Sequence, residues 1–310
     1  MSRDKEQITK NQHIVPERHL KNFCILNKNR LVAFNIDELR IEKDQSPNSI
    51  CRDYFHYAMY PGNYDEYSQI VEKKFGNLEN WYSNNFQRIE SNLLQKVIPS
   101  DEDRYGISLL VANFHFRGRI FRAEIKNSLE QVIDFLQPSL AEDFHTEMEK
   151  RYPHLFTKND KNFTSNIIRE GLYEYIQNTS YATNRSFDEG FPNTLTHKNW
   201  KILINNSNEN PFITSDEAVI ELIPEWASKN TVLKSYLIKT QIFHLSPRIA
   251  IICLYPFNED EHGKTQFLDI TENEKAVNGN NLQYINYAHK YAYSPNKYFF
   301  EKIIKENSVL

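Results

Sequence analysis

The sequence predicts an α+β fold, with a central helical bundle of long helices packed on a small, mostly antiparallel sheet. Apolar residues recur at helical spacing in the helical centre, residues 66–180, whereas short apolar runs separated by turn residues fill residues 199–310. Helices followed by strands, rather than a regular alternation, favour the α+β class. We expect a polar tail over residues 1–12 and a single α+β domain over residues 13–310.

The elements nearest the start of the chain are short. Pro16 suits the first turn of a helix over residues 16–24, because the missing N–H has no acceptor there. Residues 30–36 are mostly apolar and β-prone, which predicts a strand. The aromatic residues of 54–60 are expected to pack on the core.

The middle of the chain is predicted to be helical. An amphipathic helix runs from Tyr67 to Pro99, with a break near Gly76. Ser100 and the acidic residues after it are typical of the start of the next helix. The next helix is expected over residues 101–135, and Pro138 is expected to end it. Two further helices are expected over residues 139–150 and 163–178.

The residue pattern of the C-terminal third is typical of β-strands. Its β-branched and aromatic runs alternate with Asn, Ser and Pro clusters. The expected elements are strands 200–205, 212–214, 219–223, 242–245 and 248–255, helix 280–289, strand 291–294 and a closing helix 296–305.

Composition excludes several classes of protein. The 310 residues carry 37 Lys+Arg and 41 Asp+Glu, a net charge of -4, which argues against coating nucleic acid by bulk charge. The 8 glycines are too scattered for a phosphate-binding glycine loop. Cys24, Cys51 and Cys253 form no zinc or disulfide pattern. Without a signal-like start or a long apolar run, we expect a cytoplasmic protein with no membrane association.

Several short segments occur together in a recognisable order. They are His13-Ile-Val-Pro followed by Leu20-Lys-Asn-Phe, Glu72, Leu78-Glu79, Arg117, Phe212-Ile-Thr-Ser-Asp216 and Leu245-Ser-Pro-Arg248. As a set, they resemble the bacterial domain of unknown function 4238 over residues 13–294. The resemblance implies a shared fold and no established activity. Many such proteins resemble the products of accessory or mobile-element genes, which suggests a nuclease-like or toxin-like role in a defence or toxin system.

The chain also departs from that family pattern. Ile14 replaces the usual aromatic residue after the histidine. Gly118-Arg119 stands where Thr-Pro is common, and Glu217-Ala-Val stands in place of Asn-Pro-Val.

Four polar residues from separate segments are the candidates for chemistry. We expect His13, Arg117 and Asp216 to be catalytic, with Glu72 and Asp216 as metal ligands. Glu72 and Glu79 lie seven residues apart, about 10.5 Å along a helix, so the two cannot hold one ion by themselves.

Each candidate also has a structural alternative. His13 and Asp216 occupy positions where side chains cap helices or turns. Arg117 shares a face with two phenylalanines, which suits an ion pair with Glu72 or Glu79 as well as a phosphate. His19 is expected to be a hydrogen-bonded core histidine.

Two further residues are candidates for substrate binding. Ser215 and Arg248 are expected to bind substrate at the same cleft as Asp216. Ser215 lacks the Gly-x-Ser-x-Gly frame of a serine hydrolase nucleophile.

These residues suggest two functions. The first is metal-assisted (Mg²⁺ or Mn²⁺) or acid–base phosphodiester cleavage, as in a nuclease-like effector. The second is a non-catalytic module that binds a nucleotide or a partner protein encoded by a neighbouring gene and acts as a sensor or accessory subunit. Nucleic acid is a further candidate partner, and the aromatic stretches 54–60 and 284–300 are compatible with a homodimer.

Overall fold

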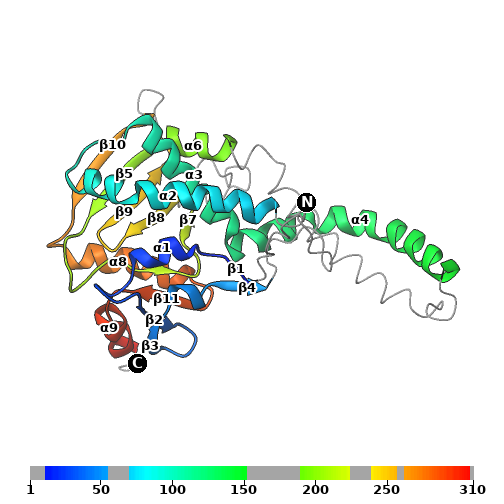
Figure 1. The fold of residues 1–310 in the computed structure, drawn as a ribbon, viewed down its shortest axis with the longest axis horizontal. Helices are drawn as coiled ribbons and strands as arrows, with labels where there is room; N and C mark the ends of the chain where they lie inside the picture. The colour runs from blue at the N-terminus through cyan, green and yellow to red at the C-terminus, as the bar shows by residue number, and fades with distance from the viewer. Residues whose placement is uncertain (1–10, 55–69, 152–188, 224–238, 257–261, 308–310) are drawn as a thin grey trace, which may run out of the picture. The chain divides into compact units, whose positions relative to one another are not determined.

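The computed structural model describes residues 11–54, 70–151, 189–223, 239–256 and 262–307 (Figure 1). The chain divides into two compact units. The larger unit comprises His13–Asp53, Phe75–Arg119 and Arg185–Leu310; the smaller comprises Met1–Gln12, Tyr54–Lys74 and Ile120–Asn184. The single domain over 13–310 stays a prediction. The expected helix 163–178 and most of the aromatic stretch 54–60 lie outside the described residues.

A five-stranded sheet forms one layer of the larger unit, in the order β10-β5-β9-β8-β7. β10 runs parallel to β5, and the other neighbours are antiparallel. The strands are β5 (Asn199–Ile204), β7 (Val219–Leu222), β8 (Thr240–Ser246), β9 (Ile249–Leu254) and β10 (Thr265–Asp269).

A four-stranded sheet has the order β3-β2-β11-β6. Its strands are β2 (Leu31–Asn35), β3 (Arg40–Gln45), β6 (Thr214–Ser215) and β11 (Tyr291–Ser294). β11, the last strand of the chain, lies antiparallel between β2 and β6. A separate two-stranded sheet pairs β1 (Asn11–His13) with β4 (Arg52–Tyr54).

The α+β class is confirmed, but the described helices form no clear central bundle. Two long helices instead meet the five-stranded sheet (Figure 1). The Tyr82 hydroxyl donates to the Leu245 carbonyl of β8, and Phe114 packs edge-on against Phe243 of the same strand. The apolar face of a helix can be covered equally well by another helix or by a sheet, and the sequence does not specify which. For this reason the prediction of a central helical bundle was wrong. The helices are α1 (Glu17–Asn22), η1 (Pro47–Ser49), α2 (Ile70–Leu94), α3 (Asp101–Arg117), α4 (Arg119–Arg151), α6 (Phe191–His197), α8 (Glu274–Tyr287) and α9 (Tyr298–Asn307).

The helix boundaries differ from the prediction at two places. The expected helix 101–135 is interrupted at Gly118, whose backbone is extended (φ -62°, ψ 148°). α4 then continues through Pro138, which was expected to separate two helices. A proline removes one backbone donor and disfavours helix interiors, yet a long helix tolerates one. No described helix is both long and apolar enough to cross a bilayer.

An apolar core joins the two sheets of the larger unit. α8 contacts β7 of the five-stranded sheet and β6 and β11 of the four-stranded sheet. The core cluster contains Val32, Phe34, Ile213, Ile220, Ile242, Tyr284, Ile285, Ala292, Phe299, Phe300 and Ile303. Because β11 and α8 both take part in it, the C-terminal segment is integral to the core.

Two histidines are completely buried in this unit. His19 lies within hydrogen-bonding distance of the Tyr82 hydroxyl (3.5 Å) and the Thr214 hydroxyl (3.4 Å), as expected of a core histidine. His244 contacts the Ile213 carbonyl at 2.6 Å. Desolvation lowers the pKa of each to about 3, so both are neutral at pH 7.

This burial predicts a loss of stability in mild acid. A histidine whose pKa is lower in the folded state than in the unfolded chain favours the folded state at every pH above the unfolded pKa of 6.5. This stabilisation is lost progressively as the pH falls below 6.5. We expect each histidine to remove about 2 kcal/mol of unfolding free energy between pH 6.5 and about pH 5. Urea unfolding at both pH values measures it, and a His19→Gln variant with an equally steep decline would contradict it.

Two glycines predict opposite effects of the same substitution. A Cβ at Gly106 would lie 2.1 Å from the Trp81 ring, whereas nothing lies within 4 Å of one at Gly279. We expect Gly106→Ala to destabilise the protein by about 1–3 kcal/mol through overpacking. Gly279→Ala should stabilise it by about 0.5–1 kcal/mol through helix propensity. Denaturant unfolding measures both, and a stabilised Gly106→Ala would show the contact to be wrong.

Candidate functional site

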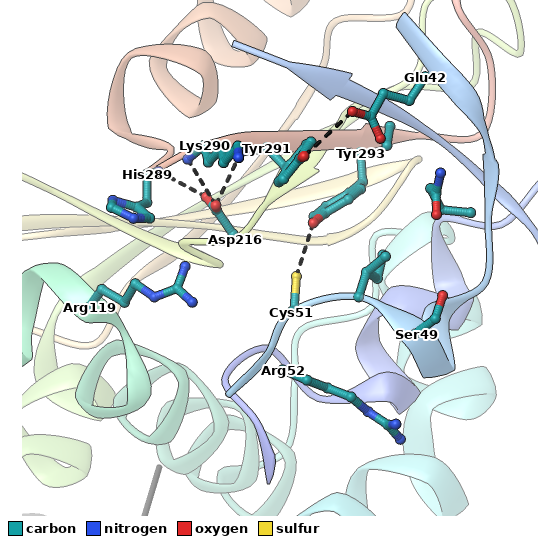
Figure 2. A pocket seen from close by; sticks show the side chains of 13 residues that line it. Glu42, Ser49, Cys51, Arg52, Arg119, Asp216, His289, Lys290, Tyr291 and Tyr293 are labelled. Atoms are coloured by element: carbon teal, nitrogen blue, oxygen red, sulfur yellow. Dashed lines mark hydrogen bonds between the residues drawn. The ribbon is translucent and has the colours of Figure 1, made fainter. Parts of the chain in front are cut away.

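A polar pocket of about 420 Å³ opens in the larger unit (Figure 2). Its walls come from the β2–β3 hairpin, residues 49–52, Arg119 and Asp216, and the segment that leads into β11. Cationic and anionic side chains both line it. The pocket is therefore suited to a polar ligand that carries charge.

Asp216 joins two walls of the pocket. Its carboxylate accepts hydrogen bonds from the backbone N–H groups of His289 (2.8 Å), Lys290 (2.9 Å) and Tyr291 (3.1 Å). Burial raises the pKa of this carboxyl group, whereas the three N–H donors and Arg119 act in the opposite direction. The short strand β6 places Asp216 next to the start of β11, which explains why these backbone groups converge on it.

Arg119 faces Asp216 from another wall (Figure 2). Its Nη2 donates to both carboxylate oxygens of Asp53, at 2.9 and 3.0 Å. Within the described part of the chain, its Nε and Nη1 have no hydrogen-bond partner. An arginine held on one edge presents its remaining donors to a ligand.

Two tyrosines complete this region of the pocket. The Tyr291 hydroxyl donates to Glu42 at 3.4 Å, and the Cys51 thiol donates to the Tyr293 hydroxyl at 3.3 Å. Burial and the Asp216 charge raise the pKa of the Cys51 thiol, so it stays protonated at pH 7. Cys51 is therefore unsuited to act as a thiolate nucleophile.

His13, a predicted catalytic residue, contacts the pocket only through a neighbour. Its Nε2 accepts a hydrogen bond from Nε of Arg52 at 3.0 Å, and Arg52 lines the pocket. Desolvation, followed by the charges of Arg52 and Arg117, lowers the pKa of His13 to about 4. An imidazole nitrogen that already accepts a hydrogen bond from an arginine is poorly placed to take a proton from a substrate at pH 7.

Arg117, also predicted to be catalytic, lies in a buried ion pair. Its Nη1 donates to Glu79 at 2.6 Å, and its Nη2 donates to the His13 carbonyl. The guanidinium carbon lies 4.6 Å from the centre of the Phe75 ring. Of the two partners expected for an ion pair, the structure shows Glu79.

The other predicted residues are separated from one another. Ser215 exchanges hydrogen bonds with the backbone of Glu217. Arg248 is exposed at the β8–β9 turn and donates to Asn206 at 2.6 Å. Glu72 belongs to α2, but its side chain lies outside the described residues. Among the predicted site residues whose side chains the structure describes, only Asp216 lines the pocket, and the roles assigned to all of the predicted residues stay predictions.

A metal site is not evident in the residues that the structure describes. No group of three or more His, Cys, Asp or Glu side chains there is arranged to hold an ion. Asp216, predicted to be a ligand, has its carboxylate hydrogen-bonded to backbone N–H groups. Binding of Mg²⁺ or Mn²⁺ stays a prediction.

Local patterns in the sequence offer little indication of four of the lining residues. Arg52, Arg119, His289 and Lys290 all belong to the pocket. Arg119 stands in the most basic segment of the chain, and that charge density was the one available signal. His289 and Lys290 become site residues only because β11 pairs with β6, which is separated from it by some 75 residues.

Comparisons with known proteins give one match. A family model described as "Protein of unknown function (DUF4238)" matches residues 11–298. Neither a curated protein nor a solved structure matches the chain.

The Arg117–Glu79 pair predicts a stability defect. Arg117→Met should lower the unfolding free energy by about 2–3 kcal/mol, somewhat below the cost for a fully buried pair because Glu79 is partly exposed. The exposed pair Lys297–Glu301 offers a matched control, and Lys297→Met should change stability by less than about 0.5 kcal/mol. Urea unfolding measures both, and equal effects would argue against a structural ion pair.

Proposed function

Because this chain belongs to the DUF4238 family, whose function is unknown, we propose its function from the pocket: it binds a nucleotide through the phosphate groups. The observation that carries this proposal is the guanidinium of Arg119, which is anchored on one edge by Asp53 and presents its other donors to the pocket. Arginine in this state suits the planar, bidentate recognition of phosphate.

Further cations line the same pocket. Arg52 is oriented by His13 and Asn48, and Lys290 lies with its ammonium 5.4 Å from the centre of the Tyr291 ring. With Arg119, they supply three positive charges from three segments of the chain. Phosphates carry more than one negative charge, so several cations from different walls favour such a group over a monovalent anion.

The remaining lining groups suit the rest of a nucleotide. Glu42 offers a carboxylate that can accept hydrogen bonds from sugar hydroxyls, as acidic residues commonly do in nucleotide sites. The Tyr291 ring lines the pocket and is partly exposed, and an aromatic ring in such a position supports base stacking.

Phosphodiester cleavage, as expected of a nuclease-like effector, is a second candidate function. His289 lines the pocket beside Asp216 and Arg119 (Figure 2). Its imidazole suits proton transfer, the role expected of His13, while Arg119 suits stabilisation of phosphate charge, the role expected of Arg117. Participation in a defence or toxin system is a further prediction from the sequence.

Calorimetric titration tests nucleotide binding. ATP, ADP and inorganic pyrophosphate serve as probes, with and without Mg²⁺. We expect saturable binding that Arg119→Gln weakens about tenfold or more, because a charge-assisted contact contributes about 1.5–3 kcal/mol. Arg18→Gln, which changes an exposed arginine of α1 that does not line the pocket, is the matched control.

Two outcomes would decide against the proposal. The proposal is wrong if none of the three probes binds. It is also wrong if the Arg119→Gln and Arg18→Gln variants bind the probes with equal affinity. Turnover of a phosphodiester that His289→Gln abolishes, with affinity unchanged, would favour the second candidate function.

A further inference from the structure

We infer that Glu217 is a positioning residue that fixes Arg119 in the pocket by binding the backbone on which Arg119 stands. This inference rests on the proposed function and deepens it, because it identifies what orients the phosphate-binding arginine. Glu217 has no assigned role, and it stands directly after Asp216.

The contact between the two residues is direct. The backbone N–H of Arg119 donates to Oε1 of Glu217 at 2.8 Å. Arg119 is the first residue of α4, where backbone N–H groups have no acceptor within the helix. The carboxylate therefore satisfies a donor that the helix leaves open, and its negative charge is favourable at a helix start.

Gly118 makes room for this contact. A Cβ at position 118 would lie 2.3 Å from Oε2 of Glu217, too close for any side chain. Gly118 also forms the extended link between α3 and α4. The Glu217 carboxylate thus packs directly against the Cα of Gly118, and a larger residue at position 118 would displace the carboxylate.

Glu217 is itself held in place. Its backbone N–H donates to the Ser215 hydroxyl at 3.1 Å, and the same hydroxyl donates to the Glu217 carbonyl at 2.7 Å. The residue as a whole is only 4% exposed. A buried carboxylate on a fixed backbone has little freedom to move, so it holds its partner firmly.

The two neighbouring carboxylates act on different walls of the pocket. Asp216 binds the backbone that carries His289, Lys290 and Tyr291, whereas Glu217 binds the backbone that carries Arg119. The Ser215-Asp216-Glu217 segment therefore aligns the cations of both walls, and its carboxylates work through hydrogen bonds to backbone rather than to a ligand.

Two substitutions remove the contact and one retains it. Glu217→Ala deletes the acceptor, and Gly118→Ala displaces it while Glu217 remains. Glu217→Gln keeps an oxygen acceptor at the same place and is the conservative rescue variant.

The first measurement is the affinity for pyrophosphate. We expect Glu217→Ala and Gly118→Ala to weaken binding about tenfold, as Arg119→Gln does, and Glu217→Gln to stay within about threefold of the unmodified protein. The double variant Glu217→Ala/Arg119→Gln should bind no more weakly than Arg119→Gln alone, because both changes remove the same interaction. Additive losses would overturn the inference.

The second measurement needs no ligand. In ¹⁵N NMR spectra, the backbone N–H signal of Arg119, the group that donates to Glu217, should be protected from exchange with water in the unmodified protein and in Glu217→Gln. It should exchange at least tenfold faster in Glu217→Ala. Unchanged exchange in Glu217→Ala overturns the inference, whereas a Glu217-dependent signal without pyrophosphate binding overturns only the proposed function.

Discussion

The hydrogen bonds between the Asp216 carboxylate and the backbone before β11 are the interaction on which the site depends. Three N–H donors converge on one buried side chain, and they connect the end of β6 to the start of β11. The cost of burying a carboxylate is recovered only when several donors compensate it. Without this contact, the segment that carries His289 and Lys290 would lose three of the hydrogen bonds that attach it to the rest of the pocket.

The sequence predicted the local structure better than the long-range structure. The apolar spacing of Tyr82, Ile89 and Phe114 is a local property, so α2 and α3 were expected close to where they occur. β3 and β10 were missed because strands such as Arg40–Gln45 are short and mostly polar. The break at Gly118 was missed because the carboxylate that bonds to the start of the next helix, Glu217, lies about 100 residues away.

In the candidate site, too, local features were predicted better than long-range contacts. Asp216 was expected because a carboxylate after a short strand is a recognisable local signal, and it lines the pocket. Arg117 carries a similar local signal, yet its guanidinium is bonded to Glu79 and to the backbone of His13. The next arginine, Arg119, lines the pocket instead. A break of one residue between two helices decides which arginine faces the core and which faces the pocket, and no periodicity in the sequence indicates that break.

The central place of β11 has a consequence for the order in which the protein is assembled. β2 pairs with β3 soon after both are synthesised, but its second edge stays open until residues 291–294 emerge. During translation, some 250 residues therefore separate that edge from its partner, and non-local pairing of this kind slows folding. A ribosome-bound chain that ends before Tyr291 would expose the edge to chaperones and to other nascent chains, so synthesis rate and chaperone supply bear on the yield of this protein.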